Sequence, residues 1–179
     1  FQITDFDNSM FSIKGELDGG QNTQTFTSTN QFIGLLIGKE EFLLPIEVTN
    51  EIIMMNQLTF VPRAPRFIEG LINLRGTILP TINLRKMMSL PNEAPTQQCR
   101  IIIANYENVT VGLIVDATSN VVTLYPEQLQ QQSLAGKGRG AELISAISKR
   151  ENVIKGVLDI AKILAGTGIA YQAADVPEA

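Results

Sequence analysis

The sequence predicts an all-β protein with short helical elements, and two observations support this prediction. The first is a succession of short apolar runs, rich in Ile, Val, Leu and Thr and separated by turn signals at close spacing. Many short strands at regular spacing are typical of a β-barrel or sandwich and not of βαβ units. The runs cover residues 32–37, 42–48, 67–74, 77–84, 100–106, 109–115, 121–125, 142–148 and 153–158.

The second observation is a likeness between the two halves of the chain. The pattern of residues 42–52 recurs at 111–121, with Thr49 matching Thr118, and further on Asn83 matches Asp159. Each half therefore predicts a hairpin, a short irregular or helical turn, a second hairpin and the start of a helix, which Asn83 and Asp159 can cap. Chance similarity between apolar hairpins is the alternative explanation. The shared order of elements favours two similar β-barrels packed together.

Length and composition limit the class of protein. At 179 residues the chain can bury a substantial core, as one domain or two small ones. Hydrophobic residues make up 44% of the chain and charged residues 18%, a composition typical of folded proteins. The net charge of −4 argues against a nucleic-acid binder, because phosphate binding needs clustered Lys and Arg. No apolar run approaches the length of a membrane span and no secretory signal opens the chain, so we expect no membrane insertion.

The residue types present argue against catalysis. The chain has no histidine, which excludes a Ser-His-Asp triad, a Cys-His pair and imidazole metal ligands. Cys99 is the single cysteine; it permits no internal disulfide and suits a reducing cytosol, so we expect a cytoplasmic protein. No carboxylates are paired at a spacing that suggests acid–base chemistry. We therefore expect a protein that is not an enzyme and that holds no cofactor and no metal.

Polarity divides the chain into three parts. Residues 1–29 are rich in Thr, Asn, Gln, Asp and Gly, which predicts a flexible N-terminal arm, and residues 170–179 predict a loose C-terminal tail. Residues 30–169 form the folded domain, whose two halves meet near 85–100. Because the chain begins with Phe1, it can also be a piece of a longer protein.

Two short motifs have ordinary explanations. Residues 136–141 contain G-x-G-x-x-A, but no buried strand precedes them, as a dinucleotide-binding turn requires, so a mobile surface loop is the better interpretation. Asn108 begins a formal glycosylation acceptor without any secretory context. It lies between two apolar runs, which predicts a hairpin turn at Tyr106–Asn108.

Arg75-Gly76 is the most informative turn. It separates two apolar runs, where a hairpin built only for stability would carry Asn-Gly, Asp-Gly or Gly-Gly. A long, permanently charged side chain on a rigid hairpin suggests recognition through directional bonds to a carboxylate. We predict Glu51 as its partner, because a carboxylate amid Ile52 and Ile53 needs one to stay ionised. Arg63 and Arg66 are expected on a solvated face.

Apolar residues also stand where polar ones would be expected. Residues 52–55 (Ile-Ile-Met-Met) and 121–124 (Val-Val-Thr-Leu) occupy matching places in the two halves. Burial in the core is the default interpretation. If the two barrels face each other, these segments would instead line a shared apolar groove that suits an amphipathic helix of a partner.

The segment from Val61 to Arg85 closely resembles the signature of the CheW-type chemotaxis coupling family. The matching residues are Pro62-Arg-Ala-Pro-Arg-Phe-Ile-Glu-Gly70, Asn73-Leu-Arg-Gly76, Ile78, Pro80 and Asn83-Leu-Arg85; 112–116 and 156–160 resemble two later strands. The resemblance covers about residues 30–165. It implies two SH3-like five-stranded β-barrel subdomains with short helical elements, in an adaptor that couples chemoreceptors to the CheA histidine kinase.

The resemblance also implies partners and site residues. One surface of the first barrel would meet the regulatory domain of CheA, and the chemoreceptor's helical hairpin tip would dock in the groove between the barrels. Glu51 and Arg75 match the family's Glu and signature Arg. Gly70, Asn73, Gly76 and Pro80 match its structural signature, and the positions matching the partner-binding groove are Thr49, Ile52, Thr118 and Val121.

This chain departs from the family pattern at three positions. Asn83 replaces the usual Asp, which keeps a helix cap but removes a charge. Thr49 and Thr118 stand where Val is common, which predicts a more polar groove. An alternative reading makes the chain the CheW-like regulatory domain of a larger signalling protein, either a CheA kinase or a CheV-type fusion of a coupling domain with a receiver.

Overall fold

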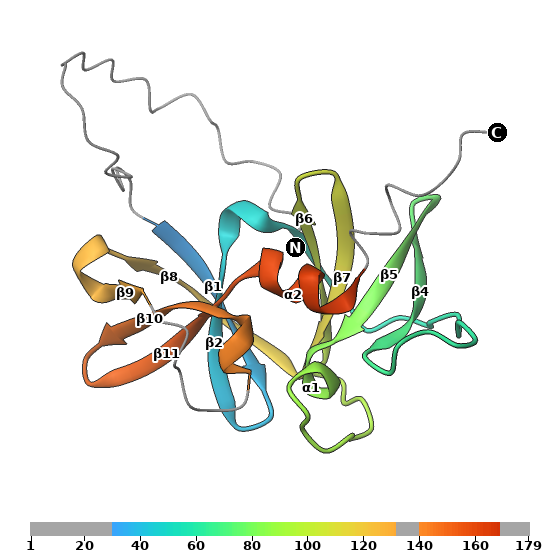
Figure 1. Cartoon of the computed structure of the whole chain (residues 1–179), viewed down its shortest axis with the longest axis horizontal. Coiled ribbons are helices and arrows are strands. Elements are labelled where there is room, and N and C mark those ends of the chain that lie inside the picture. Colours follow the sequence, from blue (N-terminus) through green and yellow to red (C-terminus); the bar gives the residue numbers. More distant parts are fainter. Residues whose placement is uncertain (1–29, 132–139, 169–179) are drawn as a thin grey trace, which may run out of the picture.

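The computed structural model describes residues 30–131 and 140–168 (Figure 1). More than half of these residues belong to β-strands, and two short α-helices and three 3-10 turns make up the other regular elements. The all-β class and the short helical elements are thereby confirmed. The expected N-terminal arm, most of the glycine-rich motif and the expected C-terminal tail lie outside the described residues.

The elements follow one another in the order that their numbering gives. The strands are β1 (Asn30–Ile37), β2 (Glu40–Pro45), β3 (Thr49–Met54), β4 (Ile68–Leu74), β5 (Thr77–Asn83), β6 (Arg100–Tyr106), β7 (Val109–Val115), β8 (Ala117–Leu124), β9 (Leu129–Gln131), β10 (Ile144–Arg150) and β11 (Val153–Leu158). The helices are α1 (Leu84–Met87) and α2 (Ile160–Thr167), with 3-10 turns at Ile46–Val48, Pro126–Gln128 and Ala141–Leu143.

Two strands have no counterpart among the apolar runs of the sequence. β3 begins with Thr-Asn-Glu and β9 consists of Leu-Gln-Gln. Both are edge strands of their sheets, so one side of each has no strand neighbour and water reaches it. Because these strands contain polar residues, they do not form apolar runs in the sequence. The hairpin turn expected at Tyr106–Asn108 is confirmed between β6 and β7.

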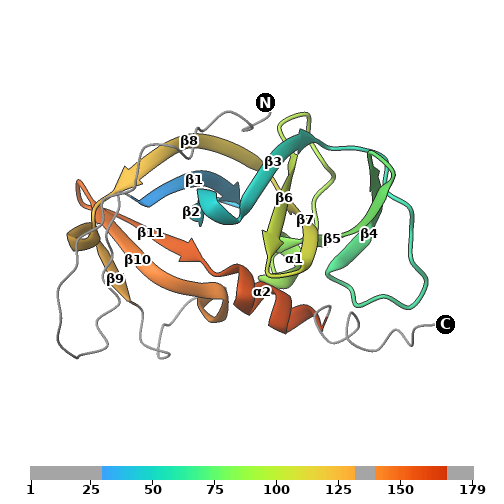
Figure 2. The same cartoon turned by 90° about the horizontal axis from the view of Figure 1, so that it is seen from above.

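The strands form two sheets that exchange hairpins between the halves of the sequence. The six-stranded sheet has the order β8-β1-β2-β11-β10-β9, and the five-stranded sheet has the order β3-β6-β7-β5-β4. Hairpin β1–β2 thus lies in a sheet with strands of the second half, and β6–β7 lies in a sheet with strands of the first. Figure 2 shows the two sheets side by side. Neither sheet closes through backbone pairing of its described edge strands.

The internal repeat predicted from the sequence is visible in this arrangement. Each half supplies a hairpin, an edge strand (β3 or β8), a second hairpin and a helix, and the second half adds the short edge strand β9. In each sheet the hairpin from one half of the sequence pairs with a hairpin from the other half through two parallel strands. These strands are β5 and β7 in the five-stranded sheet and β2 and β11 in the six-stranded sheet. Apart from β9, the two halves of the sequence are therefore equivalent in topology, but each sheet contains strands from both of them.

Three apolar clusters explain why so many runs in the sequence are continuous. The largest lies between the sheets and draws on β1, β2, β5, β6, β7, β11 and both helices. Smaller clusters fill the inside of the five-stranded sheet and of the six-stranded sheet. In β6, Ile102 faces the shared cluster while Ile101 and Ile103 face the smaller one. A strand buried on both faces has no polar alternation, and the exchange ties both sheets to one core.

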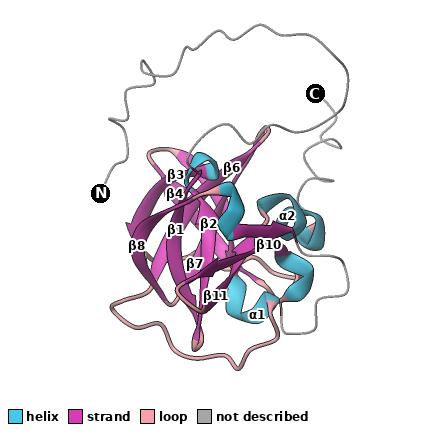
Figure 3. Cartoon of the chain, turned by 90° about the vertical axis from the view of Figure 1, so that its left-hand side faces the viewer, coloured by secondary structure: helices cyan, strands magenta, loops and turns pink. Residues whose placement is uncertain are grey.

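The two helices begin where the sequence predicts. Asn83 Oδ1 accepts a hydrogen bond from the Lys86 backbone at 3.3 Å, and Asp159 Oδ1 accepts one from the Ala161 backbone at 2.9 Å. Both residues are therefore the N-caps expected of them. Figure 3 shows α1 and α2 on the same side of the molecule, away from β8 and β3.

Candidate functional site

The turn between β4 and β5 holds Arg75 in a fixed and costly backbone conformation. The register pairs Leu74 with Thr77, so Arg75 and Gly76 form a two-residue loop, with φ of 49° and 86°. Positive φ at both central residues is the type I′ geometry that suits the strand twist and favours Asn-Gly. Asn73 Oδ1 accepts a hydrogen bond from the Gly76 backbone at 2.9 Å. The hairpin thus holds the charged residue Arg75 in the left-handed region, which non-glycine residues rarely adopt.

Arg75 is paired with Glu51, as the sequence predicts. The guanidinium Nη2 donates to Glu51 Oε1 in an ion pair. Glu51 lies in β3, and β3 and β4 are opposite edges of the five-stranded sheet. The pair therefore spans the gap between the edges where backbone pairing does not close the sheet. The Arg75 side chain is 57% exposed, so the pair contributes only about 0.2–1 kcal/mol to stability and leaves the guanidinium open to a partner.

The other signature residues support this hairpin. Thr59 forms an isolated bridge with Leu71 through two backbone hydrogen bonds of 2.8 Å. A Cβ on Gly70 would lie 2.6 Å from Thr59 O, so only glycine allows this approach. The Thr81 hydroxyl donates to Gly70 O at 2.8 Å in a buried position. Pro80 pairs with Leu71 in the register of β4 and β5.

The four residues expected near a groove lie on two different edge strands. Thr49 and Ile52 are in β3; Thr49 is 8% exposed and donates to Pro45 O at 3.2 Å, and Ile52 packs against the shared cluster. Thr118 and Val121 are in β8, half-buried and 49% exposed respectively. Figure 2 shows β3 and β8 on the face opposite α1 and α2. These two edge strands therefore lie on one face, while no hydrogen bond joins the side chains of Thr49 and Thr118 in the described part of the chain.

The apolar segments of the two halves divide between core and surface. Ile53 and Met55 pack on the cluster inside the five-stranded sheet, whereas Met54 is 68% exposed. Leu124 is buried, while Val121 projects from the edge of its sheet. Burial is the right interpretation for most of these residues. Met54 and Val121 remain available to a partner.

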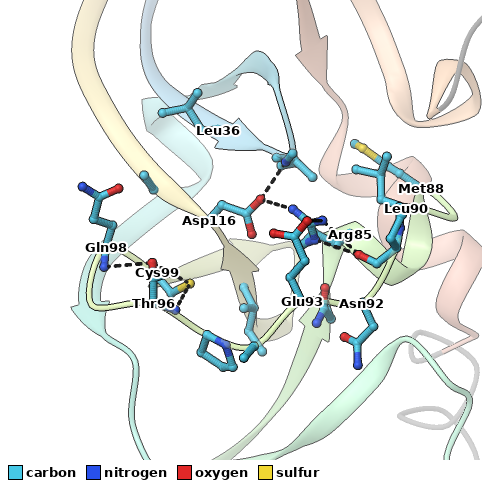
Figure 4. Close-up of a pocket in the computed structure, with 18 of the residues that line it drawn as sticks. Leu36, Arg85, Met88, Leu90, Asn92, Glu93, Thr96, Gln98, Cys99 and Asp116 are labelled. Carbon is cyan, nitrogen blue, oxygen red and sulfur yellow. Dashed lines mark hydrogen bonds and ion pairs between the residues drawn. The ribbon is translucent and has the colours of Figure 1, made fainter.

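Sequence reasoning missed a second ion-pair site, around Arg85. Its guanidinium is 9% exposed and donates to Asp116 Oδ2 at 2.6 Å and to Pro91 O at 2.9 and 3.1 Å, with Glu93 at 3.1 Å (Figure 4). Asp116 Oδ2 also accepts from the Gly38 backbone at 2.6 Å. Burial opposes the charged form, but the hydrogen bond and charge of Asp116, helped by Glu93, raise the pKa of Arg85 above its ordinary value.

This cluster lies in a pocket of about 950 Å³ where the β1–β2 turn, the start of β8 and the chain after α1 meet. It joins parts of both sheets, since Gly38 belongs to the first hairpin and Arg85 follows β5. In sequence, Asp116 has the appearance of an ordinary residue after a strand, and Arg85 that of a surface cation. Only their distance in the fold, not a local pattern, reveals the pair.

The described residues contain no cluster of three His, Cys, Asp or Glu side chains that could hold a metal ion. Within the same part of the chain, no helix is both long and apolar enough to cross a membrane. The distinctive features of the chain are instead a charged hairpin turn held in place and two edge strands on one face. They define a β-sheet module suited to binding other proteins.

Comparison with known proteins gives the family. A family model described as the CheW-like domain matches residues 31–167. The "Chemotaxis protein CheW" of Bacillus subtilis (strain 168) is 29% identical over 142 residues, which cover 79% of this chain and 91% of that protein. The protein of the same name from Helicobacter pylori is 26% identical over 155 residues, with 82% and 94% covered.

A solved structure gives the same result. The scaffolding protein TtCheW from Thermoanaerobacter tengcongensis aligns with a TM-score of 0.69 and 26% identity, over 74% of this chain and 90% of that one. The chain belongs to the CheW-like family, as the sequence predicted. It is a chemotaxis coupling adaptor, and the fold of two sheets is that of a CheW scaffold.

Proposed function

We propose that this protein couples chemoreceptors to the CheA histidine kinase through protein contacts alone, as a cytoplasmic scaffold without catalytic activity. The observation that supports this most directly is the Arg75–Glu51 pair, because it gives the signature hairpin a defined shape and leaves its guanidinium 57% exposed. A charged group on a fixed turn can contact a partner with little loss of conformational freedom.

The two partners would use different surfaces. The five-stranded sheet, with Arg75 and Glu51 at its rim, would meet the regulatory domain of CheA. The face carrying β3 and β8 would receive the receptor's helical hairpin tip, with Ile52 and Val121 as its apolar contacts. Thr49 donates its hydroxyl to Pro45 O, so this threonine adds little free polarity to the groove. Thr118 is the position at which receptor preference would differ from relatives that carry valine.

Reconstitution with a receptor and CheA tests the coupling role. We expect receptor control of kinase activity to require this protein, while CheA alone phosphorylates itself without it. Kinase activity that responds to receptor ligand equally well in its absence would contradict the proposal.

A matched pair of variants tests the receptor surface. Val121→Glu places a charge on β8, at a residue exposed enough to leave the fold intact, and should reduce receptor capture at least about tenfold. Val153→Glu is the control, because Val153 is 51% exposed against 49% for Val121 but lies at the β10–β11 turn. Equal loss in both variants would place the receptor elsewhere.

A further inference from the structure

A second, smaller pocket opens at the end of the six-stranded sheet, and it plays no part in the proposed coupling. Its volume is about 200 Å³. Leu43 and Leu124, both 1% exposed members of the cluster inside this sheet, form its apolar floor. The wall around this floor is formed by Val122 of β8, the last residues of β10 and the first residues of β11, which include Val153. Openings at the end of a curved sheet are common places for small ligands.

Ser148 is the unusual residue in this wall. It is 3% exposed, and none of the hydrogen bonds among the described residues involves its hydroxyl. Ala146, two residues earlier in β10, packs on the cluster inside the sheet, so Ser148 and Arg150 share that inward face. Burying a hydroxyl without a partner is costly. A donor that is buried, unpaired and lining a pocket indicates that a ligand supplies the missing acceptor.

The charges around the pocket suggest which acceptor. Three ionisable side chains line it, Arg150, Glu151 and Lys155. Lys155 is bound to Glu41 at 2.8 Å, whereas Arg150 has no ion pair in the described part of the chain. A carboxylate placed between the Ser148 hydroxyl and Arg150 would satisfy both groups, since Arg and hydroxyl donors bind carboxylates through charge-assisted bonds.

We propose that this pocket binds a small carboxylate with a compact apolar body. The volume sets the size of that body, because apolar cavities of about 150 Å³ hold benzene, and 200 Å³ leaves room for a carboxylate as well. The apolar part would rest on Leu43 and Leu124, and the carboxylate would point to Ser148. The pocket lies on the inward side of β8, where Val122 and Leu124 line it, whereas the proposed receptor contact Val121 is exposed on the outside of that strand. The pocket is also separate from the Arg75 hairpin, so failure of this proposal would leave the coupling function untouched.

Benzoate is the probe, titrated into the full chain and followed by amide chemical shifts. We expect saturable shifts at Val122, Ser148 and Val153, with benzamide binding more weakly and benzylamine more weakly still. Ser148→Thr keeps the hydroxyl and adds a methyl group, and Ser148→Val has a similar shape with a methyl group in place of that hydroxyl. The Ser148→Thr variant should bind benzoate at least about tenfold more tightly than the Ser148→Val variant, because it keeps one hydrogen bond to a charged group.

Ser145→Ala is the control, because Ser145 lies in the same strand and its hydroxyl already donates to Val157 O at 3.5 Å. It should bind benzoate as the unchanged chain does. Equal affinities of the Thr and Val variants would overturn the proposal, as would benzylamine binding at least as tightly as benzoate. Shifts confined to residues outside the pocket, or no saturation for any of the three probes, would overturn it too.

Discussion

Arg75 and Glu51 join opposite edges of one sheet through their side chains, where the backbone leaves a gap. The equivalent turn of the second half shows what is special here. Between β10 and β11, Glu151 and Asn152 have φ of 49° and 63°, the same left-handed pair as Arg75 and Gly76. The left-handed backbone conformation of this two-residue turn is therefore common to both halves of the sequence. The cation and its carboxylate partner belong to the first half alone.

Arg75→Ala should separate stability from function. Because the ion pair is largely exposed on the arginine side, we expect the free energy of unfolding to fall by no more than about 1 kcal/mol. Receptor-dependent kinase activity should fall much further. Urea unfolding and the reconstituted assay measure the two effects, and a much larger loss of stability would make Arg75 a structural residue.

A charge reversal distinguishes two roles of the pair. Glu at position 75 is compatible with the turn, since Glu151 adopts the same φ in the equivalent turn. Combining Glu51→Arg with Arg75→Glu rebuilds the pair in the opposite sense. If the pair acts by holding the sheet edges, the double variant should regain the coupling lost in each single one. If Arg75 binds a partner carboxylate directly, the double variant should stay inactive in the same assay.

Asp116→Ala should destabilise the protein strongly, because it leaves the buried guanidinium of Arg85 without its closest carboxylate. We expect a loss of about 3 kcal/mol, at the lower end of the range for removing one partner of a buried pair, since Pro91 O and Glu93 still accept hydrogen bonds. Asp116→Asn should lose less, because its amide oxygen can still accept from Gly38. Urea unfolding gives these values.

Glu93→Ala provides the comparison for that experiment. Glu93 is 70% exposed, so its removal should change the free energy of unfolding by less than about 1 kcal/mol. An effect as large as that of Asp116→Ala would show that the exposed carboxylate, and not the one shared between the sheets, holds Arg85.

Local signals were sufficient for some of this architecture and insufficient for the rest. The cap at Asn83 and the partner of Arg75 followed from residue chemistry, since turn, cap and buried-charge preferences act over short distances or demand a specific partner. The exchange of hairpins did not, because a strand's pattern specifies burial and not which strand lies beside it. The Arg85–Asp116 pair depends on that exchange, so no pattern in the sequence could reveal it.

Gly70→Ala should destabilise the hairpin because its Cβ would meet backbone, which cannot rotate away. The added atom would lie 2.6 Å from Thr59 O, and we expect a loss of about 1–3 kcal/mol, as for overpacked sites. Gly76→Asn is the control: a side chain at Gly76 meets nothing within 4 Å, and asparagine tolerates positive φ. Thermal unfolding should therefore separate the two variants, and equal melting temperatures would contradict the steric argument.

Glu41 should make the stability of the six-stranded sheet depend on pH. Its carboxylate accepts from Lys155 at 2.8 Å and from the Ser119 hydroxyl at 2.6 Å. The hydrogen bond from Lys155, followed by that from Ser119, lowers the pKa of Glu41 below its ordinary value of 4.5, against the opposite effect of burial. A carboxyl group with a lower pKa in the folded state adds stability above its unfolded pKa, and this is lost as the pH falls through the folded value.

Glu41→Gln should therefore be less stable than the unchanged chain at pH 7, and the difference should be smaller at pH 3. Both side chains of the pair are about a third exposed or less, so the difference at pH 7 should be about 1 kcal/mol or smaller. Urea unfolding at the two pH values measures it, with Glu40→Gln as the control, since the neighbouring Glu40 has no ion pair among the described residues. A difference that persists unchanged at pH 3 would mean that Glu41 acts through packing and not through its charge.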